Sequence, residues 1–252
     1  MKSIILFSLI VLLAICGVTT AKAKELNGQE ILSNIENANE SKDRTSSLKM
    51  ILIDDRGKEN LREIKFWTKG KNRRLIKFLS PADVKGVGYL VLDADLPSEK
   101  MCLYLPAFNK VRRIAGSGKS GSFMGTDFSY SDISSTLYAE DYDAKRLPDQ
   151  NDQYVLELKR KAGSNKDYAR LTIWADRNFV PIKIEFYTQE NAPNPQKIMI
   201  VEKIEKSGKY WISKKITMED LRKKHKTVLE LSDITFDSGL PDSLFTERNL
   251  QK

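Results

Sequence analysis

Cysteine and histidine are scarce in this chain, and their scarcity narrows its chemistry. The 252 residues include two cysteines, Cys16 and Cys102, and a single histidine, His225. Zinc sites and nucleophile–histidine pairs need several such residues at defined spacings, and those spacings do not occur here. His225 stands in the charged run RKKHK at 222–226, which predicts a solvent-facing histidine on a strand. We therefore expect no catalytic residues, no metal site, no cofactor and no enzymatic activity.

A nucleotide-binding loop is also lacking. The segment 116–121 reads GSGKSG, but it does not have the spacing of a P-loop, and no strong helical pattern follows it. Proline is infrequent, with eight residues, and no tract rich in proline, glycine and serine divides the chain. We see no internal repeat, so the sequence predicts one continuous domain after its N-terminal segment.

Only one apolar run is long, and it lies at the N-terminus. Residues 4–18 are almost wholly apolar, Lys2 precedes them, and the sequence AKA follows at 21–23. A membrane span needs about 20 apolar residues, so this pattern predicts a cleaved export signal over 1–23 and a mature domain over 24–252. An uncleaved anchor is one alternative. Lipid attachment at Cys16 is another, although Ile15 stands where a small residue is required.

Removal of this segment would leave Cys102 as the only cysteine. An intrachain disulfide is then impossible, even in an oxidising compartment. The stability of the mature protein must therefore come from a hydrophobic core.

The charge balance is basic, with 42 Lys and Arg against 34 Asp and Glu and a net charge of +8. The basic residues alternate along the predicted strands instead of forming one cluster, which predicts solvated strand faces and no nucleic-acid partner. The remaining excess would suit anionic lipid head groups or an acidic partner surface.

Hydrophobic periodicity predicts a mainly β protein. Asn27 and Glu30 form a capping-box pattern before a helix that extends to about Glu40. Alternation with a period of two then predicts about 11 to 13 short strands, with a short helix over 131–137. A large antiparallel sheet curls and must cover its apolar face. We therefore predict a single curved sheet of about 11 strands that forms an incomplete, half-open β-barrel, with a few helices as a lid or plug.

One loop is unusually apolar. The segment GSFMGTDF at 121–128 places Phe123, Met124 and Phe128 among glycines, whereas loops are normally polar. Glycines permit movement, and methionine adapts to irregular apolar ligands. The pattern predicts a movable apolar lid, with core packing as the alternative.

This loop and its neighbours carry a family resemblance. The blocks FLSPADVKGVGYL at 78–90, LYLP at 103–106, RRI at 112–114 and GSFMGTDF resemble outer-membrane lipoprotein-sorting proteins, which are similar to the periplasmic carrier LolA and the receptor LolB. The resemblance extends from about residue 27 to the LPDSLFT motif that ends at 246. It implies the half-barrel fold, a periplasmic location and lipoprotein or lipid cargo. The LYLP and GSFMGTDF blocks are similar to the subset paired with RND-type exporters.

The expected acyl-binding residues come from the alternating strands and from the loop. They are Phe66, Phe78, Leu90, Leu103, Leu105, Phe123, Met124 and Phe128. Each of them could instead belong to a filled core. Arg112 and Arg113 are adjacent on one strand, so only one can face inward, where it would pair with Asp127 to close the lid or contact a phosphate head group. A solvated arginine pair is the alternative.

Together these features predict a monomeric periplasmic carrier or chaperone that moves a lipoprotein or lipid toward the outer membrane. Its expected partners are an inner-membrane transporter, an outer-membrane receptor and the cargo. The alternative function is an envelope lipid sensor or scaffold that uses the same cavity. The identity of the cargo is left open by the sequence.

Overall fold

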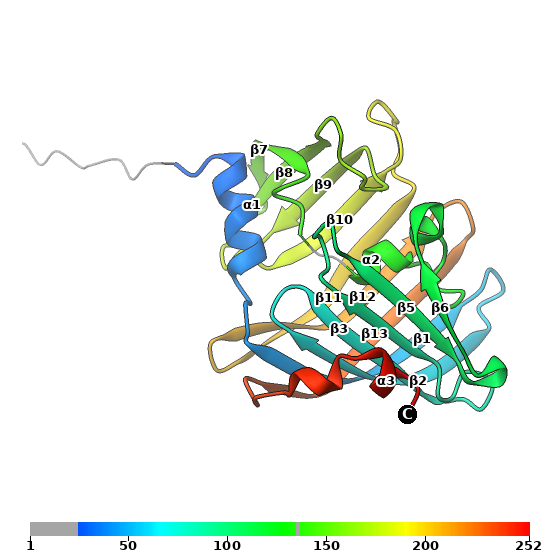
Figure 1. Cartoon of the computed structure of the whole chain (residues 1–252). Coiled ribbons are helices and arrows are strands. Elements are labelled where there is room, and N and C mark those ends of the chain that lie inside the picture. The colour runs from blue at the N-terminus through cyan, green and yellow to red at the C-terminus, as the bar shows by residue number, and fades with distance from the viewer. Residues whose placement is uncertain (1–24, 135–136) are drawn as a thin grey trace, which may run out of the picture.

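A computed structural model describes residues 25–134 and 137–252, so the predicted export signal over 1–23 lies outside the described residues. A single antiparallel sheet dominates the described chain (Figure 1). Its strands are β1 (Asp43–Ile53), β2 (Glu59–Lys69), β3 (Arg73–Ser80), β4 (Gly88–Leu92), β5 (Lys100–Leu105), β6 (Lys110–Ile114), β7 (Tyr142–Gln150), β8 (Gln153–Arg160), β9 (Arg170–Ala175), β10 (Pro181–Tyr187), β11 (Lys197–Ser207), β12 (Tyr210–Asp220) and β13 (His225–Phe236). The α-helices are α1 (Gly28–Asn37), α2 (Tyr130–Ser134) and α3 (Glu247–Leu250), and the 3₁₀ turns are η1 (Pro106–Phe108), η2 (Gly116–Ser120) and η3 (Asp242–Leu244).

The strand order is β6-β5-β4-β3-β2-β1-β13-β12-β11-β10-β9-β8-β7. In the described chain the two end strands, β6 and β7, do not pair with each other, so the sheet is curved but not closed. Neighbours in this order are also neighbours in sequence, except where β1 pairs with β13. The predicted half-open antiparallel barrel is thus confirmed, with 13 strands in place of about 11.

Strand β7 is the strand that the sequence pattern did not reveal. It reads YDAKRLPDQ and lacks clean alternation, and it contains Pro148. Proline cannot donate to a ladder and is tolerated on edge strands, and β7 pairs only with β8 at the end of the sheet. The register also shifts between Leu147 and Gln150.

Helix α1 begins as its capping pattern predicts. The Asn27 side chain accepts a hydrogen bond from the Glu30 amide at 2.9 Å, and the Glu30 carboxylate accepts one from the Asn27 amide at 2.8 Å. The helix ends at Asn37, before the expected limit. It lies against β7 so closely that a Cβ on Gly28 would approach the Ala144 carbonyl oxygen to 2.3 Å. Glycine is therefore required at this contact.

The two faces of the sheet carry separate cores. The larger core includes Ile31 and Leu32 of α1 and residues of the 121–130 loop, and we call the face that carries it the inner face. The smaller core lies on the outer face, where Phe245 and Leu250 of the C-terminal segment cover Leu75, Leu90 and Cys102. Both faces of β3–β5 are consequently buried.

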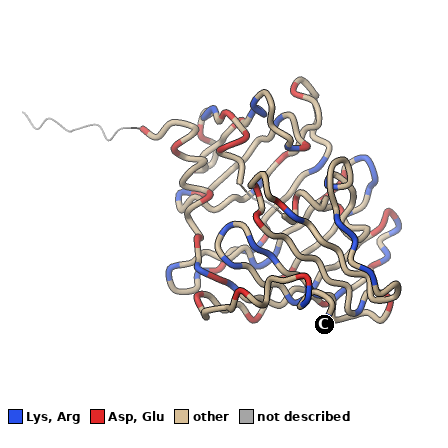
Figure 2. Tube along the Cα trace, viewed as in Figure 1, with Lys and Arg blue, Asp and Glu red and all other residues tan. Residues whose placement is uncertain are grey.

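Charged residues of both signs occur throughout the trace (Figure 2). Lys and Arg positions lie beside Asp and Glu positions on strands and turns, and many form ion pairs such as Lys159–Glu190 and Lys215–Glu202. This distribution agrees with basic residues that decorate solvated strands. No described helix has the length and apolar character needed to cross a membrane.

Asp43 ties the C-terminal segment to the start of β1. Its carboxylate is 3% exposed and accepts hydrogen bonds from the Ser238 amide and hydroxyl and from the amides of Gly239 and Leu240, at 2.8 to 3.1 Å. Burial alone would raise the pKa of Asp43, but these hydrogen bonds together hold that pKa below its usual value. The ionised carboxylate is thus the form that stabilises the fold.

The Asp43→Asn variant should therefore lose about 1.5–3 kcal/mol of stability at neutral pH, because hydrogen bonds to a charged acceptor become neutral ones. Since the folded pKa is depressed, this contribution is present above the unfolded pKa of about 3.9 and is lost as the pH falls through the folded value. Urea unfolding from pH 7 down to acid pH measures it, with the exposed Asp233→Asn as a control. A difference that does not shrink in acid would contradict this role for the charge.

Candidate functional site

The apolar loop packs inside the half-barrel. The Phe123 amide donates to the Phe128 carbonyl at 2.8 Å, and Ser122 and Ser129 form an isolated β-bridge, which closes residues 123–128 into a compact turn. Phe123 is 0% exposed and Phe128 is 5% exposed. The turn inserts both rings into the inner core, which agrees with the alternative of core packing.

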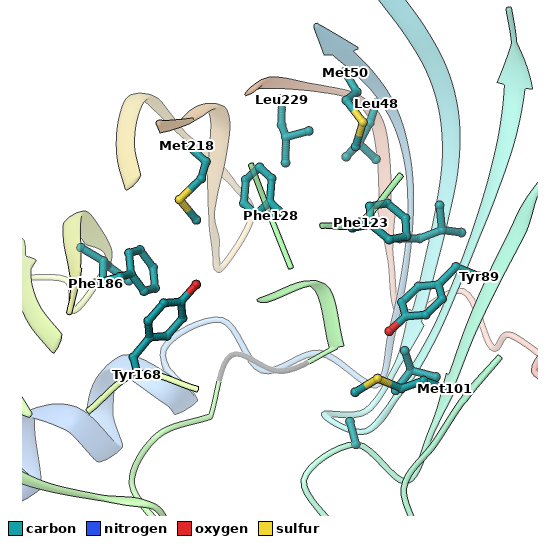
Figure 3. Packing of buried hydrophobic residues seen from close by; sticks show 14 of the residues in the cluster. Leu48, Met50, Tyr89, Met101, Phe123, Phe128, Tyr168, Phe186, Met218 and Leu229 are labelled. Carbon is teal, nitrogen blue, oxygen red and sulfur yellow. The ribbon is translucent and has the colours of Figure 1, made fainter. Parts of the chain in front are cut away.

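Phe123 lies in an aromatic cluster. Its ring centroid is 5.2 Å from that of Tyr89, 5.5 Å from that of Tyr130 and 6.0 Å from that of Phe78. Figure 3 shows Phe123 on the side of Tyr89, while Phe128 lies toward Met218 and Leu229 of the other strands. The loop thus packs against β3 and β4 through Phe123 and lies toward β12 and β13 through Phe128.

Polar contacts hold the loop to strands on both sides. Asp127 is 2% exposed, and its Oδ2 accepts a hydrogen bond from the Thr227 hydroxyl and lies 2.7 Å from His225 Nδ1. The Thr227 hydroxyl accepts a hydrogen bond from the Asp127 amide at 3.0 Å. On the opposite side, Arg62 of β2 donates to the Met124 carbonyl at 2.6 Å. The loop is therefore anchored to β2 and β13.

This anchoring corrects two expectations. His225 does not simply face solvent, because its side chain is 23% exposed and pairs with Asp127. Arg112 and Arg113 do not pair with Asp127 and are both exposed on the edge strand β6. Arg112 lies opposite Leu103 and Arg113 opposite Cys102, so Arg112 is the one on the inner face. Sequence spacing could not reveal the Asp127–His225 contact, since it joins residues 98 positions apart.

A cavity of about 370 Å³ remains on the inner face, between α1 and the sheet. One row of its lining crosses four strands in direct register, with Ile173 opposite Ile184, Ile184 opposite Met199 and Met199 opposite Met218. Further apolar lining comes from Ile35, Phe66, Phe128 and Phe186. The floor of the cavity is thus apolar and is built from side chains on one face of adjacent strands.

Polar residues surround this floor. Asp132 caps the start of α2, since its carboxylate accepts a hydrogen bond from the Ser129 amide at 2.7 Å. The same carboxylate oxygen lies 3.2 Å from Lys197 Nζ and 3.2 Å from the Tyr168 hydroxyl. Burial, together with the Asp132 charge, raises the pKa of Tyr168 well above its usual value, so Tyr168 remains a neutral donor. A second cavity of similar volume lies beside the first one, between the 95–99 turn and the 163–168 loop.

The structure separates the predicted lipid-binding residues into three groups. Phe66 and Phe128 line the cavity. The inner core contains or contacts Phe78, Leu103, Leu105, Phe123 and Met124. Leu90 lies on the outer face beneath the C-terminal segment. Its expected place in the cavity was wrong, because the run GYLVL of β4 is buried on both faces and its pattern does not identify the inner one.

Sequence reasoning identified β9–β12 but did not single out their cavity-lining side chains. Ile184 and Phe186 of β10 stand two residues apart, as do Ile173 and Leu171 of β9. That alternation marks one face of each strand. Only the register between strands brings these faces into one surface. Within residues 25–134 and 137–252, no group of three or more His, Cys, Asp or Glu residues could hold a metal ion.

Comparisons with known proteins agree with this architecture. A family model described as an uncharacterized protein matches residues 70–252. A DUF1329 family protein from Desulfovibrio piger is 30% identical, with a TM-score of 0.83 over 88% of this chain and 97% of that one. A structure from Vibrio parahaemolyticus, described as an outer membrane lipoprotein-sorting protein domain, is 28% identical, with a TM-score of 0.80 over 89% and 98% of the two chains.

A third solved structure shares the fold at lower identity. It is a LolA superfamily protein from Nitrosomonas europaea, 22% identical, with a TM-score of 0.72 over 89% of this chain and 100% of that one. Among curated proteins, none matches this sequence.

Proposed function

Since this chain belongs to the DUF1329 family and is similar in structure to an outer-membrane lipoprotein-sorting protein domain and to a LolA superfamily protein, we propose that it is a periplasmic carrier that binds the acyl chains of a lipoprotein or another lipid. The inner cavity receives the acyl part of the cargo, and the protein delivers it toward the outer membrane. The carrier performs no covalent chemistry on the cargo.

The apolar cavity is the observation that supports this proposal. Each methylene that leaves water contributes about 0.8 kcal/mol, so a chain of roughly sixteen carbons costs on the order of 12 kcal/mol to expose. A carrier between two membranes must replace that burial with apolar protein surface. The row from Ile173 to Met218 supplies such a surface, together with Phe66 and Phe128.

The direction of transport requires partners. Cargo release from an inner membrane and acceptance at an outer membrane each need a protein that contacts the carrier. We propose an inner-membrane transporter of the RND type and an outer-membrane receptor, on the strength of the LYLP and GSFMGTDF blocks at 103–106 and 121–128. The mature domain over 24–252 would act as a monomer after cleavage of the export signal.

Lipid analysis of the exported protein tests this function. Native mass spectrometry of the protein purified from periplasm is expected to show a mass increment that organic extraction removes and identifies as lipid. Delipidated protein should then take up a fluorescent fatty-acyl probe. Protein that carries no lipid and takes up no probe would contradict the carrier function, whereas bound lipid without transfer to membrane vesicles would favour a lipid sensor.

A further inference from the structure

Two arginines at the edge of the cavity make no direct ion pair with a described carboxylate. Arg44 of β1 and Arg74 of β3 both line it, and Arg74 is only 8% exposed. Asp95 and Glu99 lie near enough to favour the charged form of Arg74, but neither guanidinium lies within ion-pair distance of a described carboxylate. The contacts that they do make are weaker, since Arg74 donates to the Lys71 carbonyl at 2.9 Å and Arg44 lies 5.6 Å from the centroid of the Phe66 ring.

The other charged groups around the cavity are already engaged. Lys71 Nζ lies 3.4 Å from the Glu40 carboxylate, and Lys197 lies 3.2 Å from Asp132. The Glu36 carboxylate accepts hydrogen bonds from the amides of Tyr138 and Ala139. Among the residues that line this cavity, the two arginines are thus the cations that form no ion pair with a described carboxylate, although Asp95 and Glu99 partly offset the charge of Arg74.

Register places the arginines in one row with a hydroxyl between them. Arg44 lies directly opposite Thr68 of β2, and Thr68 lies directly opposite Arg74. Thr68 also lines the cavity. Residues directly opposite one another on adjacent strands project from the same face, so the two guanidinium groups and the hydroxyl lie on the same face of the sheet beside the cavity.

The next row inward is largely apolar. Ser46 lies opposite Phe66, and Phe66 lies opposite Ile76. The inner face therefore changes within two residues of each strand from a cationic row at its edge to an apolar floor. A ligand that spans this boundary must have an anionic end and an apolar body.

Burial disfavours the charged form of both guanidinium groups. Burial, together with the charge of Arg74, lowers the pKa of Arg44 to about 10, and burial also lowers the pKa of Arg74. Both groups remain protonated at neutral pH, and Asp95 and Glu99 favour the charged form of Arg74. An anion placed between them would supply charge-assisted hydrogen bonds, which arginine forms with the planar fork geometry suited to carboxylate and phosphate.

We propose that Arg44, Thr68 and Arg74 form a head-group subsite that binds the carboxylate or phosphate of an anionic lipid whose acyl chain occupies the cavity. This inference rests on the proposed carrier function and narrows its cargo to amphiphiles with a negatively charged end. The exposed Arg112 and Arg113 are not part of this subsite.

A pair of probes that differ only in charge tests the subsite. A fluorescent long-chain fatty acid and its methyl ester are titrated into the whole delipidated protein. The acid should bind about tenfold more tightly or better, the effect of a charged hydrogen bond. The Arg44→Gln/Arg74→Gln variant should lose this preference while it retains its affinity for the ester. Thr68→Val should reduce the preference in part.

The matched control is Arg112→Gln/Arg113→Gln, which removes the same charge from the exposed edge strand. It should leave the preference unchanged, and thermal melting checks that each variant is folded. Equal binding of acid and ester by the wild-type protein would overturn the head-group subsite and leave the carrier function intact. Failure of both probes to bind would overturn the carrier function itself.

A further arm separates a lipid head group from a free anion. Inorganic phosphate alone is added as a competitor at physiological ionic strength. It should displace the fatty acid only weakly, because it does not occupy the apolar floor. Displacement at micromolar phosphate would show that a free anion is the ligand, and loss of the preference in the control variant would show a general charge effect. Either result would overturn the proposal.

Discussion

The Phe123→Ala variant is expected to unfold with a free energy about 3–5 kcal/mol below that of the wild-type protein, the usual cost of removing a buried ring. Phe123 is 0% exposed and packs against Phe78, Tyr89 and Tyr130. Its removal would leave a void between the loop and β3–β4 that the anchored backbone cannot close. Urea or guanidinium unfolding measures the change.

The matched control is Phe108→Ala in η1. That ring is 70% exposed, so its removal should change stability by no more than about 0.5 kcal/mol. A loss at Phe123 as small as that of the control would mean that the ring is not packed in solution. The loop would then behave as the movable lid that its composition predicts.

The Met199→Trp variant is expected to lower the affinity for a fluorescent fatty-acyl probe by more than tenfold, which corresponds to about 1.4 kcal/mol. Met199 stands in the middle of the cavity floor, between Ile184 and Met218. Indole is larger than the methionine side chain and would occupy the space that the acyl chain needs. The cavity also gives the indole room, so the stability loss should stay below the 1–3 kcal/mol typical of overpacked cores.

Ile200→Trp provides the control on the same strand. Ile200 is the next residue, is 43% exposed and points to the opposite face. Its substitution should leave probe affinity unchanged. If folded Met199→Trp bound the probe as tightly as Ile200→Trp and the wild-type protein, acyl chains would not enter this cavity. The cavity would then be a packing void.

The anchored loop bears on how cargo could enter. The largely buried Asp127 joins the loop to His225 and Thr227 of β13. The Met124 carbonyl joins it to Arg62 of β2. A loop held in this way forms part of the cavity wall through Phe128. Entry from the side of α1 and the Arg44–Thr68–Arg74 row avoids any need to break these contacts.

Local patterns alone determined the class of this protein and most of its elements. The Asn27–Glu30 capping box placed the start of α1, and alternation placed nearly all of the strands. These signals succeed because a cap and a half-buried strand depend on residues a few positions apart. The strand β7 escaped detection because Pro148 and irregular alternation are tolerated only at an edge, and edge position is not a local property.

The tertiary structure decided which side chains meet. Leu90 and Leu103 have the same apolar character, yet the C-terminal segment covers Leu90 on the outer face, whereas Leu103 belongs to the inner core. Asp127 finds His225 and not the nearby arginines because β13 pairs with β1 and lies beside the loop. Arg44, Thr68 and Arg74 form one row only through the registers of β1–β2 and β2–β3. Register and coverage depend on contacts between distant segments, and a one-residue shift would move every side chain of a strand to the other face.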